Sequence, residues 1–200
     1  MKNLRYLVLS LALFSGIITL GQGYVTTTYN VALPLGNTKD FIDKTSPRGF
    51  GIEAGAWLND NVSLGLEFSW NGFYKEYDYD TYYNIDGSTL TLSGRMWRYT
   101  NVYPLMGVVK YYLNSDSDFE AFLGAGLGTF IINKRTDFGL YTLEDHQWHF
   151  ALYPEVGFIY WFSDAAGFTF NTRYNWAAKS GDIDAQSNLG FNFGFVFYSF

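Results

Sequence analysis

The sequence predicts an all-β chain folded as an eight-stranded, antiparallel, up-and-down barrel, and three observations lead to this prediction. Apolar and polar residues alternate in segments of about ten residues, a period that indicates strands with one apolar face. The connections between these segments alternate strictly between short and long. Aromatic residues make up 21% of the chain, yet the mean hydropathy is only -0.06. A barrel that is apolar outside and polar inside has this near-neutral average, so the pattern favours a transmembrane barrel.

The first residues have the features of an export signal. Lys2 and Arg5 precede a mostly apolar stretch from Tyr6 to Leu20, and small residues follow it. We expect residues 1–21 to be a signal peptide cleaved after Gly21, and residues 22–200 to form one barrel domain. An N-terminal membrane anchor is the alternative, but polar residues dilute the stretch and no basic flank follows it. Beyond the N-terminus there is no apolar run of the roughly 20 residues that a membrane helix needs.

The strands are predicted at residues 24–34, 49–58, 62–73, 101–113, 119–134, 148–162, 167–177 and 188–200. Three short connections, at 59–61, 114–118 and 163–166, are rich in Asn, Asp and Ser, which favour turns. Four long connections, at 35–48, 74–100, 135–147 and 178–187, fall between these turns. All the turns therefore lie at one end of the barrel and all the loops at the other, an asymmetry typical of transmembrane barrels.

The alternation also predicts which residues face the interior. In the third segment Leu64, Leu66 and Phe68 face outward, so Glu67 faces inward, and the second, sixth and seventh segments alternate in the same way. The fifth segment places three glycines inside, which make room for three large inward rings. These six residues are Gly124, Gly126, Gly128, Trp57, Tyr153 and Trp161. Side chains fill the interior of an eight-stranded barrel, so an open diffusion pore is not expected.

The facing of the fourth segment has two interpretations. Counting from the turn at 114–118 places Lys110 inside, whereas a short internal echo, Tyr103-Pro104 with Tyr153-Pro154, places it outside. The cost of exposing a charge to lipid favours the inside. Each proline lacks a ladder donor and should mark a bulge or an unbonded position.

The inward charges predict an interior charge network of Glu53, Glu67, Glu155, Arg173 and Lys110. The turn at 59–61 sets Glu53 opposite Glu67, and Arg173 lies near Glu155 on the neighbouring strand. Paired carboxylates are also found in general acid/base sites. In a narrow lumen, however, buried charges persist only when they are compensated, which favours a structural network.

The last segment ends in a recognisable pattern. Large apolar residues occupy the odd positions from Leu189 to Phe197, while Tyr198 and Phe200 are aromatic at even positions. We expect a bulge near Phe197 to bring the two sets onto one face.

These features together resemble a known family. The signal peptide, the eight amphipathic segments, the turn Asn59-Asp60-Asn61 before Val62-Ser63-Leu64-Gly65-Leu66, and the ending Tyr198-Ser199-Phe200 are similar to the small OmpX-like outer-membrane β-barrel proteins in their Bacteroidetes-type form. The resemblance implies an integral protein of the Gram-negative outer membrane, surrounded by lipid and monomeric. It also implies that Tyr198 and Phe200 form the signal read by the barrel assembly machinery.

Barrel enzymes that remove acyl chains from lipid A are the alternative, because His146 and His149 lie near the loop end of the sixth segment. The His-x-Ser arrangement of those enzymes would require a serine where Trp148 stands. Two histidines at this spacing on a strand also point to opposite faces, which argues against a metal site. The sequence therefore predicts no catalytic residue, no metal and no cofactor.

The connection from Tyr74 to Thr100 is the candidate for contact with an extracellular partner. Four of its tyrosines are predicted to be surface contacts, since tyrosine offers area at little entropic cost. They are Tyr77, Tyr79, Tyr82 and Tyr83. A protruding hairpin with tyrosines in cross-strand positions is the alternative. A Ca²⁺ site from Asp78, Asp80, Asn84 and Asp86 departs from the usual calcium-loop spacing.

Charge and cysteine content narrow the function further. The chain has no cysteine, and without Lys2 and Arg5 it carries 11 basic against 19 acidic residues, a formal charge of -8. Such a balance argues against nucleic acid as a partner. We expect a non-enzymatic barrel that stabilises the membrane or presents its loops to a partner. A lipid A acyl hydrolase and a narrow channel for small solutes are the alternatives.

Overall fold

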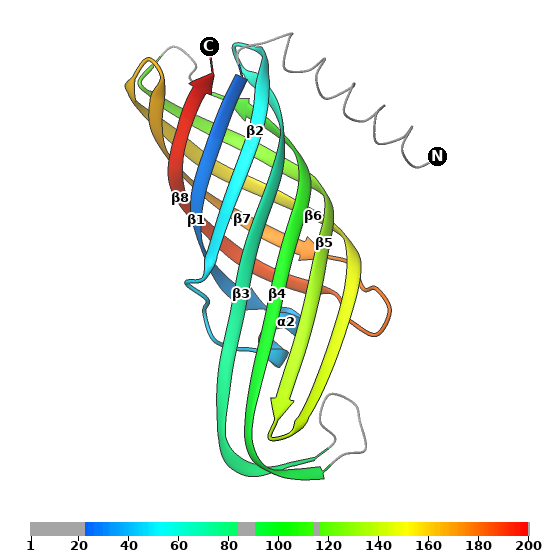
Figure 1. The fold of residues 1–200 in the computed structure, drawn as a ribbon. Coiled ribbons are helices and arrows are strands. Elements are labelled where there is room, and N and C mark those ends of the chain that lie inside the picture. Colours follow the sequence, from blue (N-terminus) through cyan, green and yellow to red (C-terminus); the bar gives the residue numbers. More distant parts are fainter. Residues whose placement is uncertain (1–22, 84–90, 114–116, 200) are drawn as a thin grey trace, which may run out of the picture.

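The chain forms one closed barrel of eight antiparallel strands (Figure 1). A computed structural model describes residues 23–83, 91–113 and 117–199, so the predicted signal peptide and Phe200 lie outside the described residues. The elements within this part are β1 (Gly23–Leu35), α2 (Gly36–Phe41), β2 (Gly49–Asn59), β3 (Val62–Tyr83), β4 (Thr91–Tyr112), β5 (Phe119–Phe138), β6 (Tyr141–Ser163), β7 (Ala166–Ala177) and β8 (Gln186–Ser199). Each strand pairs with its neighbours in sequence, and β1 pairs with β8 along its whole length, which confirms the predicted fold.

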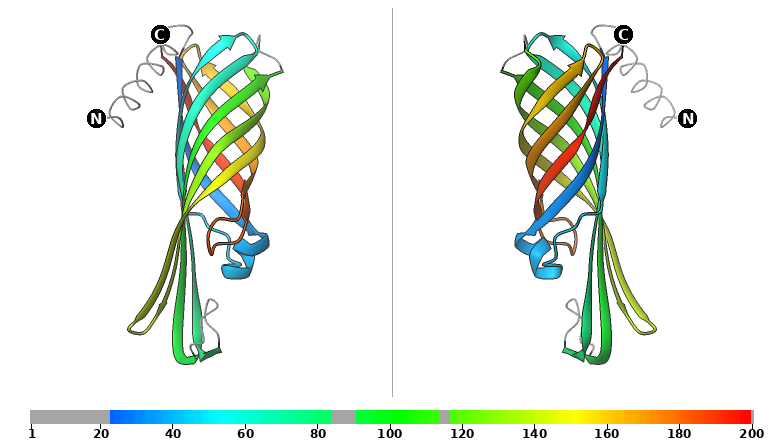
Figure 2. Two further views of the ribbon diagram at one scale, coloured as in Figure 1. Left: turned by 90° about the vertical axis from the view of Figure 1, so that its right-hand side faces the viewer. Right: turned by 90° about the vertical axis from the view of Figure 1, so that its left-hand side faces the viewer.

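Two of the predicted loops are wrong, because the strands continue into them, and at 74–100 the structure has the alternative, a protruding hairpin with tyrosines in cross-strand positions. β3 continues to Tyr83, and β4 already begins at Thr91. In the same way β5 continues to Phe138, and β6 already begins at Tyr141. β4 and β5 remain paired as far as Met96 opposite Phe138, so the four extensions form one sheet. Figure 2 shows them running well beyond the other strands. We call residues 72–83, 91–101, 133–138 and 141–146 the projecting sheet. The residues are rich in Tyr and Thr, which favour strands, and this preference continues past the point where β2 and β7 end.

The predicted facing is confirmed in the strands where it was assigned. Glu67 is buried between exposed Leu66 and Phe68, and Arg173 is buried beside exposed Tyr174. The outward apolar residues form an apolar belt around the barrel, which includes Leu64, Leu66, Phe68, Leu105, Leu123, Leu127, Phe150, Val156, Phe193 and Phe195. Among the described residues, no helix has the length and hydropathy to cross a membrane.

The fourth strand faces as burial cost predicts, with Lys110 inside and only 4% exposed. The echo between the two proline segments is misleading, because Pro104 is buried in the lumen whereas Pro154 is exposed on the outside. Both prolines do interrupt a ladder, as expected. Paired positions are missing between Phe68 and Asn71 in the β3–β4 ladder, and between Leu152 and Glu155 in the β6–β7 ladder.

The bulge expected near Phe197 is not present. β8 keeps one continuous register with β1 from Ser187 to Ser199, and with β7 as far as Phe197. Phe197 is exposed outside, whereas Tyr198 faces the lumen and stacks on Trp161 with 4.6 Å between ring centroids and 8° between planes. Because the register is unbroken, the alternation that turns Phe197 outward turns Tyr198 inward, where it fills the end of the lumen.

Candidate functional site

The lumen is filled from one end to the other, in three layers. At the turn end the filling is aromatic and apolar: Tyr24, Tyr112, Phe122, Ile159 and Val196, with Trp57, Trp161 and Tyr198 packed against them. At the loop end it combines buried polar side chains such as Asn175, Gln186 and Asn188 with an apolar cluster that includes Ile42, Phe73, Val102, Phe130, Ile132 and Ile183. Charged side chains occupy the space between these layers.

All five residues of the predicted charge network meet in this middle layer. They come from five strands, and each is at most 6% exposed: Glu53 (β2), Glu67 (β3), Lys110 (β4), Glu155 (β6) and Arg173 (β7). Glu53 and Glu67 are cross-strand partners, as the turn predicted, and so are Glu155 and Arg173.

Two strong ion pairs hold the network, and a tyrosine supports each of them. Lys110 Nζ lies 2.7 Å from both oxygens of Glu53, and the Tyr24 hydroxyl donates to Glu53 Oε1 at 2.6 Å. Arg173 Nη1 donates to both oxygens of Glu67 at 2.7 and 2.6 Å, and the Tyr153 hydroxyl donates to Glu67 Oε2 at 2.5 Å. The sequence placed Arg173 with Glu155, but its main partner is on the opposite side of the ring.

Glu155 lies between the two pairs and is bound less tightly than either. Its carboxylate is 3.9 Å from Lys110 Nζ and 3.6 Å from Arg173 Nη2. Neither of its oxygens accepts a hydrogen bond from the described residues. Gly124 on β5 provides the space, because a Cβ there would lie 2.6 Å from Glu155 Oε1. The charges thus alternate along a chain from Glu53 through Lys110, Glu155 and Arg173 to Glu67, which braces the lumen across its width.

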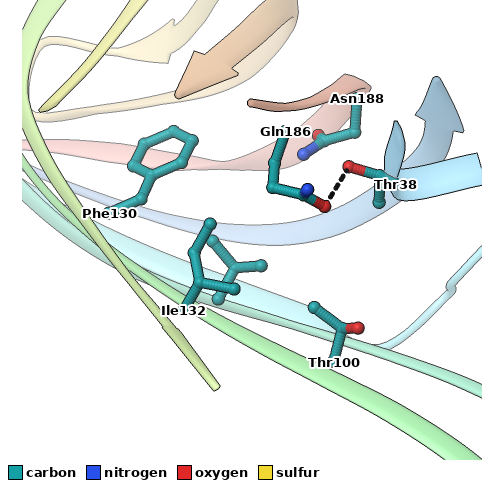
Figure 3. A pocket seen from close by; sticks show the side chains of 7 residues that line it. Thr38, Thr100, Phe130, Ile132, Gln186 and Asn188 are labelled. Carbon is teal, nitrogen blue, oxygen red and sulfur yellow. Dashed lines mark hydrogen bonds between the residues drawn. The ribbon is translucent and has the colours of Figure 1, made fainter. Parts of the chain in front are cut away.

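The loop end of the lumen is closed by the segment between β1 and β2, which the sequence predicted only as a loop. Its short helix α2 contributes Thr38, whose hydroxyl donates to Gln186 Oε1 at 3.0 Å, and Asn37 donates to the Ala185 carbonyl at 2.9 Å. After the helix, the Ile42 side chain is fully buried. A cavity of about 10 Å³ remains beneath α2, room for about one water (Figure 3). It is lined by Thr38, Thr100, Val102, Phe130, Ile132, Gln186 and Asn188.

This closing segment is also fastened to the projecting sheet. The Phe41 carbonyl accepts hydrogen bonds from the Tyr77 hydroxyl at 3.0 Å and from Arg98 Nη1 at 3.3 Å. The Phe41 ring has Arg98 Cζ at 4.6 Å and Lys134 Nζ at 4.8 Å, distances at which cations attract aromatic rings.

A salt bridge adds to this attachment. Lys75 Nζ lies 2.7 Å from Asp43 Oδ1. The hydrogen bond from Lys75 lowers the pKa of the Asp43 carboxyl and raises the pKa of the Lys75 ammonium. The closing segment is therefore tied both to the loop before β8 and to β3 and β4.

The two histidines do not form a site together. His149 is fully buried in the lumen with Nδ1 2.7 Å from the Ala178 carbonyl oxygen, while His146 is exposed on the opposite face. Within the described ranges, Nε2 of His149 has no hydrogen-bond partner, and no group of three His, Cys, Asp or Glu residues is placed to hold a metal.

The four predicted contact tyrosines separate into two pairs. Tyr77 and Tyr82 pack against buried Met96 and Phe138 inside the projecting sheet. Tyr79 and Tyr83 are 73% and 71% exposed. The first pair therefore stabilises the sheet and only the second is available to a partner. Two of the four residues of the calcium alternative, Asn84 and Asp86, lie outside the described residues.

Comparison with known proteins shows what fold this is. No family model matches the sequence, and no curated protein is detectably similar to it. Among solved structures, Neisserial surface protein A is 17% identical with a TM-score of 0.57, over 88% of this chain and 96% of that one. Ail of Yersinia pestis is 11% identical with a TM-score of 0.54, over 90% and 99%. OprG of Pseudomonas aeruginosa is 13% identical with a TM-score of 0.53, over 90% and 96%. The chain therefore has the fold of the small outer-membrane β-barrels.

Proposed function

We propose that the protein is a non-enzymatic, integral outer-membrane barrel that holds its projecting sheet at the cell surface as a contact element. The observation that carries this proposal is the contrast between a lumen filled along its length and four strands that extend past the barrel. The apolar belt suits a lipid surround, and closure by β1 and β8 leaves no unpaired edge within it.

Export and assembly belong to the same proposal. Residues 1–21 act as the signal peptide, and Tyr198 with Phe200 forms the signal for the barrel assembly machinery. The assembled protein is a monomer in outer-membrane lipid. Tyr198 has a second role in this account, since it also closes the turn end of the lumen by stacking on Trp161.

A contact role is supported by the shape of the projecting sheet and by one similar structure. Ail of Yersinia pestis, 11% identical with a TM-score of 0.50, has been solved in complex with the heparin analogue sucrose octasulfate. Ail is thus a barrel of this fold that binds a sulfated saccharide analogue. In the present chain, such contacts are made by two surfaces. One is the exposed pair Tyr79 and Tyr83, and the other is the open face of the projecting sheet.

The two alternatives are less well supported by the geometry. An acyl hydrolase needs a histidine that activates a serine, whereas His149 is fully buried and its Nε2 atom contacts no serine hydroxyl within the described residues. A channel needs a continuous polar path, whereas the rings of Trp57, Tyr112, Phe122 and Trp161 pack together across the turn end of this lumen.

Three measurements on the full chain test the proposal. Membranes that contain the protein should yield a band whose gel mobility changes on heating, and the purified protein should add no steady conductance to a planar bilayer. It should also release no acyl chains from lipid A. A protein recovered in soluble form would disprove the membrane assignment. Steady conductance would favour the channel, and acyl release that is abolished by His149→Ala would favour the enzyme.

A further inference from the structure

The outward face of β3–β6 changes its chemistry row by row toward the tip. Cross-strand partners point to the same side of a sheet, so the pairing registers define these rows. The row Phe68, Leu105, Thr129 and Phe150 belongs to the apolar belt. The next row is mainly aromatic, with Tyr103, Ile131 and Trp148 in register and Trp70 beside them; Trp70 Nε1 donates to Asn101 Oδ1 at 3.1 Å.

Above this aromatic row the same face becomes polar but keeps large rings. Three successive rows are Gly72, Asn101, Asn133 and His146; then Tyr74, Tyr99, Arg135 and Glu144; then Glu76, Trp97, Asp137 and Thr142. We call the side chains of these three rows the outer platform. Four strands and three rows give it an extent of about 14 Å in each direction. Figure 2 shows that this part of the sheet stands clear of the other strands.

The polar groups of the outer platform are paired with each other. Arg135 Nε donates to Asp137 Oδ1 at 2.8 Å, and the Thr142 hydroxyl donates to the same oxygen at 2.8 Å. Asn133 Nδ2 donates to Glu144 Oε1 at 2.6 Å. Nearby, Arg95 Nη1 lies 3.4 Å from Glu76 Oε1, and these two side chains are 60% and 44% exposed. Two of the three carboxylates are thus paired with an arginine and the third, Glu144, with an amide, so the surface has no excess positive charge that would select a strong anion.

Aromatic rings lie between these polar pairs. Tyr74 and Tyr99 are in contact, with 5.1 Å between their centroids. Trp97 lies one row above Tyr99 and is half-buried. A half-buried ring beside fixed carboxylate, amide and guanidinium groups suits a sugar, whose C–H face packs on a ring while its hydroxyls donate and accept hydrogen bonds. The core of a protein interface is depleted of charged residues, whereas the Arg135–Asp137 pair lies within this surface.

The position of the outer platform identifies the source of the sugar. It begins one row above the aromatic row, on the same face as the apolar belt. A lipid whose chains pack against the belt must place its headgroup against these three rows. From this continuity we infer that the outer platform binds the saccharide headgroup of a glycolipid in the outer leaflet around the barrel. This inference rests on the proposed membrane location.

The test compares lipids that differ only in their sugars. Full-length protein is placed in nanodiscs that contain either lipopolysaccharide with a complete core or deep-rough lipopolysaccharide without it, and thermal unfolding is followed by circular dichroism. The complete core should raise the unfolding midpoint. Calorimetric titration of delipidated core oligosaccharide into phosphatidylcholine nanodiscs should give binding that Trp97→Ala and Tyr99→Ala each weaken about tenfold, equivalent to about 1.4 kcal/mol.

Tyr160→Ala is the matched control, because Tyr160 is an exposed tyrosine of β6 that lies at the turn end of the barrel, outside the projecting sheet. It should leave both measurements unchanged. Equal unfolding midpoints in the two lipopolysaccharides would assign any stabilisation to acyl chains and phosphates and would overturn the inference. Saccharide binding that survives both Trp97→Ala and Tyr99→Ala would overturn it as well. Each variant must first show the heat-dependent mobility shift, so a misfolded variant is not counted. Failure of the unsubstituted protein to show this shift would instead disprove the proposed membrane function.

Discussion

Arg173 on β7 donates two hydrogen bonds across the lumen to Glu67 on β3, at 2.7 and 2.6 Å. The two strands lie on opposite sides of the eight-stranded ring, so this contact connects walls that share no backbone hydrogen bonds. Both side chains are at most 7% exposed. Side chains therefore brace the barrel across its lumen, in addition to the backbone hydrogen bonds that close it.

Arg173→Leu should strongly destabilise the barrel, because it leaves Glu67 buried without its cation and Glu155 with Lys110 alone. Breaking a buried pair by removing one partner costs on the order of 3–5 kcal/mol. The measurement is the midpoint of denaturant unfolding in detergent. The double variant with Glu67→Leu should recover part of the loss. An unchanged midpoint for Arg173→Leu would count against the bracing role, and Lys179→Met is a control at an exposed ion pair with Asp184.

Gly126→Ala should destabilise the barrel by overpacking, because the new Cβ would lie 2.6 Å from Cε1 of the Tyr153 ring. Overpacking of a filled interior costs about 1–3 kcal/mol. Ala125→Val is the matched control, since Ala125 is the adjacent residue on the exposed outer face. The same unfolding midpoint is measured for both. If the two variants lost equal stability, the inward position of Gly126 would not be the cause.

The contact of Asp43 with Lys75 should weaken only at the two extremes of pH. The lowered pKa of Asp43 means that the stabilisation is complete above the ordinary aspartate value and is lost as pH falls through the lowered pKa. The raised pKa of Lys75 means that the contact persists up to pH values above the ordinary lysine range. An NMR titration of the Asp43 carboxyl carbon should show the low midpoint, and Lys75→Met should return it to the ordinary value. A midpoint unaffected by Lys75→Met would contradict the contact.

Single cysteines can test the orientation, because the chain has none of its own. A membrane-impermeant thiol reagent should label Leu140→Cys and Tyr83→Cys on intact cells, since both residues are highly exposed on the projecting sheet or its tip. Leu127→Cys should resist labelling although Leu127 is 60% exposed, because lipid covers the apolar belt. Asp60→Cys, in the turn between β2 and β3, should react only after lysis. Labelling of Asp60→Cys alone on intact cells would reverse the proposed orientation.

Tyr198 and Phe200 should both affect assembly, but only Tyr198 should also affect the stability of the inserted barrel. Tyr198→Ala removes the ring stacked on Trp161 and should lower the equilibrium unfolding midpoint. Phe200→Ala should reduce the amount of protein inserted in cells and leave the unfolding midpoint of the inserted fraction unchanged, because its proposed role is recognition during assembly. Normal insertion of Phe200→Ala, measured by the heat-dependent mobility shift, would contradict that role.

The sequence by itself determined the strand order, the facing of the second, third, sixth and seventh strands, and the members of the charge network; for the fourth strand it left two facings open. Because apolar and polar residues alternate along each strand, the sequence shows directly which face of the strand is apolar. Glu67 and Arg173 could therefore be placed inside from the sequence alone. The short turns set local registers, which is why Glu53 opposite Glu67 was predictable. The same local reasoning misjudged the connections at 74–100 and 135–147, because a charged, tyrosine-rich strand in water has no apolar face to mark it.

Tertiary structure alone decided the contacts that cross the ring. Arg173 is paired with Glu155 along neighbouring strands, but its hydrogen bonds go to Glu67, four strands away, because closing the barrel brings opposite walls within reach of a long side chain. Closure also turned Tyr198 inward against Trp161 and placed α2 across the loop end. Periodicity describes one strand at a time, whereas the filling of a lumen depends on how the volumes of all eight strands combine at each level.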